Sequence, residues 1–204
     1  MASTAQAERS NQRYRTRKDL IAAAARLMRD GRKPSLEEVA EAALVSRATA
    51  YRYFPSIEAL LVEASVDIAT PDAAVLFGND TTDPEARIDR AEAAMHRMAF
   101  DNEKAIRLML AAALGRGDRD DVPVRQNRRS ALIEAALAPA RGRFKKASYE
   151  RLKAALALIF GSESMIVFKD VLRLDEKTAR EVKSWAVRAL VRAALEESKA
   201  KARK

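Results

Sequence analysis

Alanine content is the feature that most constrains the fold of this chain. Of its 204 residues, 42 are alanine, the strongest helix former but a residue that fills little core volume. Valine and isoleucine, which favour strands, together number only 20. Six glycines and six prolines leave few residues for the turns of a sandwich or barrel. The composition therefore predicts an all-α fold.

Apolar residues recur at helical spacing between proline, glycine and capping signals, which predicts about nine helices. The first of these extends from Tyr14 to Asp30 and ends at Gly31. Ser35, with Glu38 three residues later, forms a capping-box pattern that opens a short second helix. Residues 46–54 predict a third helix, which is also short.

The basic charge is concentrated at the N-terminus. The whole chain has a net charge of +9, and residues 1–55 alone carry 11 basic and 6 acidic side chains. A local basic excess favours a polyanionic partner, with nucleic acid ahead of anionic lipid, although it can also serve solubility alone. The sequence contains neither a run of 18 apolar residues nor an apolar signal core. We therefore expect a cytoplasmic protein with no membrane partner.

Residues 35–54, SLEEVAEAALVSRATAYRYF, predict two short helices joined by a tight turn. In this helix-turn-helix plan the second helix enters the major groove of DNA. Packing of Val39 and Phe54 on the preceding helix would leave the opposite face of the second helix exposed. The alternative interpretation is an ordinary helical hairpin with a solvated basic face.

The exposed face carries residue types that suit base and phosphate contacts. An arginine such as Arg47 can donate two hydrogen bonds to a guanine, and a small side chain such as Ala48 can touch a thymine methyl group. Hydroxyl and cationic side chains suit phosphates. The predicted DNA-binding residues are Arg47, Ala48, Thr49, Tyr51, Arg52, Tyr53, Ser35, Lys33, Arg13, Arg15, Arg17 and Lys18.

This region resembles the DNA-binding domain of TetR-type (tetracycline-repressor-like) transcriptional regulators. The resemblance rests on LIAAAARLM at residues 20–28 and SLEEVAEAALVSRATAYRYFPSIEALLVEA at residues 35–64. It implies a helical regulator, most often a repressor, that binds a palindromic double-stranded DNA operator as a homodimer. It also implies base contacts from Arg47, Ala48 and Tyr51. The turn in this family usually has glycine where this chain has Leu44.

The predicted organisation has four parts. We expect a disordered arm at residues 1–12, a helix-turn-helix DNA-binding domain at 13–55, a helical regulatory and dimerisation domain at 56–198, and a basic tail at 199–204. The resemblance implies that the third part binds a small effector, which we expect to be apolar or amphipathic. Its candidate lining residues are Met95, Met98, Met109, Phe160, Glu163 and Phe168, although such residues are also typical of a plain core.

Gly161 suggests where two subunits meet. It falls inside a predicted helix from Ser148 to Leu172, where a glycine costs stability unless it serves close packing. We therefore expect this helix and the last helix to form the subunit contact, with internal core as the alternative. The predicted interface residues are Ala157, Gly161, Met165, Trp185, Ala189 and Leu190.

Several kinds of chemistry are excluded by composition. The chain has no cysteine and one histidine, so disulfides and thiol nucleophiles are excluded and we expect no metal or cofactor. No histidine or lysine is placed to activate a serine, and we expect no enzyme. The predicted function is a sequence-specific DNA-binding regulator released by an effector. The alternatives are an architectural protein that binds any DNA sequence, and a small-molecule-binding module that has lost DNA binding.

Overall fold

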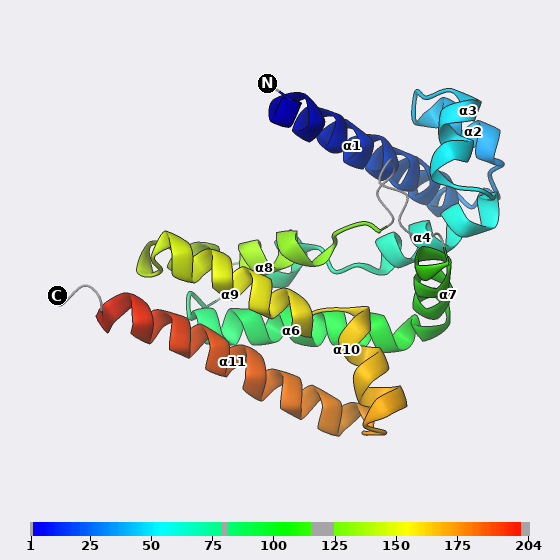
Figure 1. Cartoon of the computed structure of the whole chain (residues 1–204). Helices are drawn as coiled ribbons and strands as arrows, with labels where there is room; N and C mark the ends of the chain where they lie inside the picture. Colours follow the sequence, from blue (N-terminus) through cyan, green and yellow to red (C-terminus); the bar gives the residue numbers. More distant parts are fainter. Residues whose placement is uncertain (1, 79–80, 116–124, 201–204) are drawn as a thin grey trace. The chain divides into compact units, whose positions relative to one another are not determined.

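The computed structural model describes residues 2–78, 81–115 and 125–200, and within these ranges it contains helices and no strands (Figure 1). The all-α prediction is confirmed for this part of the chain. None of the described helices is both long and apolar enough to cross a membrane. The helical segments are α1 (Ala2–Arg29), α2 (Leu36–Ala42), α3 (Arg47–Tyr53), α4 (Ile57–Ala69), α5 (Ala73–Phe77), α6 (Pro84–Asp101), α7 (Glu103–Leu114), α8 (Arg129–Leu137), η1 (Ala138–Arg143), α9 (Lys146–Ile159), α10 (Ser162–Ile166), η2 (Val167–Val171) and α11 (Glu176–Ala200).

The chain divides into two compact units that differ from the predicted domains. The first unit comprises Met1–Ala69 and Asn102–Asn127, and the second comprises Thr70–Asp101 and Arg128–Lys204. Helix α4 packs along α1, and α7 packs on α4, so both helices belong to the first unit. A boundary at residue 55 is therefore too early, because Leu60 and Ala64 of α4 complete the core of the first unit.

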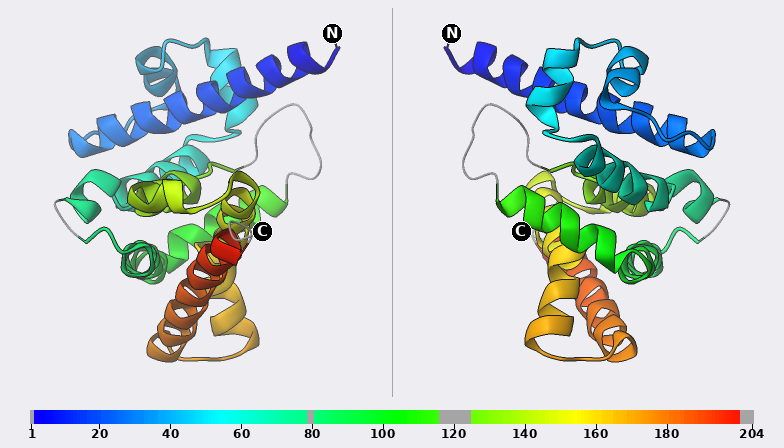
Figure 2. Two further views of the ribbon diagram at one scale, coloured as in Figure 1. Left: turned by 90° about the vertical axis from the view of Figure 1, so that its left-hand side faces the viewer. Right: turned by 90° about the vertical axis from the view of Figure 1, so that its right-hand side faces the viewer.

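Helix α1 is one uninterrupted helix from Ala2, as Figure 2 shows. The prediction of disorder is therefore wrong for residues 2–12. These residues are mainly helix formers such as alanine, glutamine and arginine, and neither glycine nor proline occurs before Gly31 to end the helix. The predicted stop is confirmed: Gly31 has φ 75°, and its N–H donates to the carbonyl of Met28 at 3.0 Å. Of the predicted basic tail, residues 201–204 lie outside the described part.

The core of the first unit joins α1 to the two motif helices and to α4. Its buried side chains are Leu20, Ile21, Ala23, Ala24, Ala25, Leu27, Leu36, Val39, Ala40, Ala50, Tyr53, Phe54, Leu60 and Ala64. The turn between α2 and α3 uses Leu44 in the left-handed region, with φ 55° and 94% of its surface exposed. A side chain in that region costs roughly 1–2 kcal/mol. The turn therefore keeps its left-handed conformation at Leu44, although glycine, which adopts that conformation without strain, is absent there.

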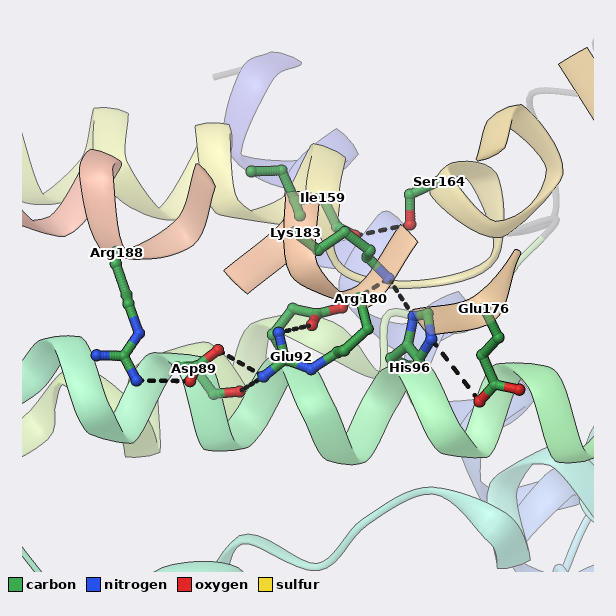
Figure 3. A network of polar contacts seen from close by, with 9 residues as sticks. All are labelled: Asp89, Glu92, His96, Ile159, Ser164, Glu176, Arg180, Lys183 and Arg188. Carbon is green, nitrogen blue, oxygen red and sulfur yellow. Dashed lines mark hydrogen bonds and ion pairs between the residues drawn. The ribbon is translucent and has the colours of Figure 1, made fainter. Parts of the chain in front are cut away.

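The second unit is centred on α6 and α11, which pack along each other, with α8 and α9 alongside. A buried ion pair joins the two central helices: Lys183 Nζ lies 2.6 Å from Glu92 Oε1 (Figure 3). Burial raises the pKa of the Glu92 carboxyl, and Lys183 opposes that rise. Lys183 also lies 3.4 Å from Nδ1 of His96. Burial and then the neighbouring cation lower the pKa of His96 to about 4, so its ring is neutral at pH 7.

Gly161 has a different role from the one predicted. Helix α9 ends at Ile159 and α10 begins at Ser162, so the predicted helix from Ser148 to Leu172 is broken. Gly161 lies in the break with φ 109°, and a Cβ there would stand 3.2 Å from the guanidinium of Arg129. The glycine therefore serves this bend and the approach of Arg129 within the subunit.

The prediction that Gly161 and Met165 lie at a subunit interface is therefore wrong. Gly161 and Met165 are both buried inside the second unit. Among the other predicted residues, Trp185 is exposed, and Ala157, Ala189 and Leu190 are partly exposed. The exposed part of the predicted subunit contact therefore lies mainly on α11.

Candidate nucleic-acid interface

Side-chain caps set the start of both motif helices. Ser35 Oγ accepts from the backbone N–H of Glu38 at 3.2 Å, and the Glu38 carboxylate accepts from the Ser35 N–H at 2.8 Å. Ser46 Oγ accepts from the N–H of Thr49 at 3.1 Å and donates to Thr49 Oγ1 at 2.9 Å. The predicted capping box and the predicted start of α3 are confirmed.

Helix α3 has one buried and one exposed face. Ala50 is fully buried and joins α3 to the core. Arg47, Ala48 and Tyr51 are exposed, as the sequence predicts, and Arg52 is exposed beside them. Thr49 is partly exposed. The side chains expected to face bases are thus available on the surface, and their contact with DNA stays a prediction.

Tyr53 does not lie on the exposed face. It is 1% exposed and belongs to the core, and Arg52 lies over its ring at 5.4 Å from the centroid. The prediction that Tyr53 contacts the DNA backbone is therefore wrong for this conformation. The reason is helical geometry, because Tyr53 follows the buried Ala50 by three residues and so shares its face.

Arg17 is also buried, which removes it from the predicted set of phosphate contacts. Its Nη1 donates to Glu63 Oε2 of α4 at 3.0 Å, and its Nη2 pairs with the other carboxylate oxygen. The guanidinium lies over the ring of Phe54, 4.9 Å from the centroid. Arg17 precedes the core residues Leu20 and Ala24 by three and seven positions, so helical periodicity places all three on one face.

The other basic residues near the motif remain at the surface. Arg15, Lys18 and Lys33 are exposed, and Arg13 is partly exposed. Ser35 is exposed as a residue, but its hydroxyl oxygen is used in the capping box. The structure thus leaves four of the five predicted basic positions outside α3 able to approach a phosphate.

Glu37 lies on this surface, although it is absent from the predicted set. Arg47 Nη2 donates to Glu37 Oε1 at 2.8 Å, and the hydroxyl of Tyr51 donates to the same oxygen at 3.2 Å. A hydrogen bond from its own backbone N–H, followed by that of Tyr51, holds the pKa of Glu37 below its ordinary value. Sequence periodicity gives no signal for these contacts, because they depend on the angle between α2 and α3.

An apolar cavity of about 250 Å³ opens between α4 and α7 of the first unit. Its lining residues are Phe54, Glu58, Ala59, Val62, Glu63, Leu108, Met109, Ala112 and Ala113. Met109 is the one member of the predicted effector pocket found here, since the other members belong to the second unit. In that unit Met95, Met98 and Phe160 are core residues, Phe168 is partly buried, and Glu163 pairs with Arg129 at 2.9 Å.

The Arg17–Glu63 pair gives a prediction about stability. We expect Glu63→Ala to lower the free energy of unfolding by about 3–5 kcal/mol, because it leaves a buried guanidinium without its counter-charge. Replacing both partners, as Arg17→Met with Glu63→Leu, should recover most of that loss. Urea unfolding followed by circular dichroism measures both effects. Wild-type stability in Glu63→Ala would contradict the structural role given to the pair.

A comparison with known protein families finds a match in the same part of the chain. Residues 20–64 match the model of the family described as bacterial regulatory proteins, tetR family. This range runs from the core-facing part of α1 through α2 and α3 into α4, so it contains the whole motif. No curated protein matches the chain significantly. The chain therefore contains, at residues 20–64, the domain described as bacterial regulatory proteins, tetR family.

Proposed function

We propose that the protein is a sequence-specific transcriptional repressor that occupies a palindromic operator as a homodimer and is released by a small-molecule effector. The observation that carries this proposal is the two-faced α3. Its inner face is fixed in the core by Ala50 and Tyr53, and its outer face presents Arg47, Ala48 and Tyr51.

A helix of this kind recognises DNA through the major groove, which is wide enough to admit it. Arg47 would donate to the O6 and N7 atoms of a guanine, and Ala48 would touch a thymine methyl group. Thr49 and Arg52 flank these residues and would contact phosphates, together with Lys33 outside the helix. Phosphate contacts supply affinity and base contacts supply sequence preference.

An architectural protein that binds any DNA sequence is the competing function. Such proteins use broad basic surfaces and apolar wedges in the minor groove. Here residues 1–55 carry 11 basic and 6 acidic side chains, and the exposed face of α3 has a defined set of donors and apolar groups. These observations favour sequence-specific binding.

Selection from random duplexes tests the proposal. We expect the full chain to enrich a two-fold symmetric sequence, and Arg47→Ala and Tyr51→Ala each to weaken binding to it by about 1–3 kcal/mol. Arg97→Ala, which removes an exposed charge from the second unit, is the matched control and should bind like wild type. If no sequence is enriched, the architectural function is supported; if DNA does not bind at all, a small-molecule-binding module remains.

The homodimer is proposed from an apolar stripe on α11. Trp185 is 73% exposed, and Val182, one turn earlier, is 40% exposed. Ala189 and Leu190 continue the stripe as partly exposed residues. Large apolar side chains gathered on one helix are typical of a surface that a partner covers. One α3 reaches only a few base pairs, so a two-fold pair of subunits would be needed to bind two half-sites.

We expect Trp185→Glu to be monomeric by sedimentation equilibrium and to lose tight operator binding while its helical content is unchanged. The reason is that an exposed tryptophan contributes little to folding of the subunit, but a buried charge at an interface is costly. Val75→Glu, which adds the same charge at another exposed apolar position, should remain dimeric. A stable Trp185→Glu dimer would place the subunit contact elsewhere.

We propose the cavity between α4 and α7 as the effector site. It shares Phe54 and Glu63 with the Arg17 contact, and Phe54 directly follows α3. A molecule in the cavity would therefore touch residues that hold α3 on α1 and α4. An apolar molecule is the suitable class, because most of the lining side chains are aliphatic or aromatic.

The apolar dye N-phenyl-1-naphthylamine is a suitable probe of this cavity. Its fluorescence should rise on binding to wild type and stay low with Ala113→Phe, which fills the cavity from α7. Ala111→Phe adds the same ring at an exposed position outside the lining and should bind the dye normally. Equal dye binding by wild type and Ala113→Phe would show that this cavity is not the site.

A further inference from the structure

We propose that Glu37 is a positioning residue that fixes the hydrogen-bonding roles of Arg47 and Tyr51 and thereby determines which bases they select. This inference rests on the proposed function, because it concerns the same DNA-binding face. It adds a residue from α2 to a recognition surface otherwise formed by α3.

Both contacts converge on one atom. Arg47 Nη2 lies 2.8 Å and the Tyr51 hydroxyl 3.2 Å from Glu37 Oε1. Arg47 and Tyr51 stand four residues apart on α3, so they are neighbours on the same face. A single carboxylate oxygen therefore holds together the two longest of the side chains expected to contact bases, from a helix other than their own.

The carboxylate also fixes the chemical role of Tyr51. An ionised carboxylate accepts hydrogen bonds but donates none, so the hydroxyl proton of Tyr51 is directed to Glu37. The lone pairs of the Tyr51 oxygen are then left to accept. In the major groove the groups that donate are the N6 amino group of adenine and the N4 amino group of cytosine. Tyr51 should accordingly favour an adenine or a cytosine.

Arg47 keeps its role as a donor while it is held. A guanidinium has five N–H groups, and the contact with Glu37 uses one of them. The remaining N–H groups can still approach the O6 and N7 atoms of guanine. The half-site should therefore contain a guanine opposite Arg47 and an amino-bearing base opposite Tyr51.

Two further observations make Glu37 suitable for this role. Its own backbone N–H and Tyr51 hold the pKa of its carboxyl low, so it stays ionised throughout the neutral pH range. The capping box that starts α2 uses Ser35 and Glu38, not Glu37. Replacing Glu37 therefore leaves the capping box of α2 intact, which helps to separate a positioning effect from a folding effect.

Operator selection with three variants tests the inference. Glu37→Ala removes the acceptor and the charge, and Glu37→Gln removes the charge but keeps an acceptor oxygen in the same place. We expect Glu37→Ala to lose about tenfold in discrimination at each of the two base positions. Glu37→Gln should keep the wild-type base preferences at both positions, and the other positions should be unchanged in both variants.

Glu41→Ala is the matched control, because Glu41 is an exposed carboxylate one turn further along α2. It should select the wild-type sequence. Unchanged base preferences in Glu37→Ala would overturn the inference and leave the proposed function standing. Equal changes in Glu37→Ala and Glu37→Gln would also overturn it, since charge alone would then explain them. If wild type enriches no sequence, the proposed function fails and this inference fails with it.

Discussion

The buried pair of Arg17 and Glu63 is the interaction on which the DNA-binding unit depends. It ties α1 to α4, and the guanidinium covers Phe54 at the end of α3. A charge buried this deeply is tolerated only with a counter-charge in hydrogen-bonding geometry. The three helices are therefore held in one arrangement, in which the outer face of α3 and Glu37 of α2 form a single surface. The geometry of the proposed recognition surface thus depends on an ion pair that is buried beneath it.

The second unit also has an ion pair at its centre, formed by Glu92 of α6 and Lys183 of α11. Arg180 adds a second cation 3.2 Å from Glu92. Both central helices are amphipathic, and these charges lie on their buried faces rather than their exposed ones. The exposed positions of α11 are mostly charged, as at Glu181, Arg192 and Glu196, but the apolar side chains of Val182 and Trp185 lie among them. The proposed subunit contact rests on these two exposed apolar side chains.

Local features could be predicted from the sequence and were confirmed. The capping residues Ser35 and Ser46 and the exposed position of Arg47 follow from short-range spacing. Helical periodicity also places Arg17 and Tyr53 on the buried face, where the structure has them. We predicted them at the surface because Arg17 is charged and Tyr53 has a hydroxyl group. The contacts of Glu37 and the bend at Gly161 were beyond prediction. They depend on how separate helices meet: α2 with α3 in one case, and α9 with Arg129 in the other.

Guanine methylation interference tests the central claim most directly. Methylation at N7 places a group in the major groove at the atom that Arg47 is expected to contact. On the selected duplex, we predict that methylation of one guanine in each half-site prevents binding of wild type, and that Arg47→Ala is insensitive to methylation at those two positions. Binding that no methylated guanine disturbs, or the same interference pattern in Arg47→Ala as in wild type, would contradict recognition of DNA by the exposed face of α3.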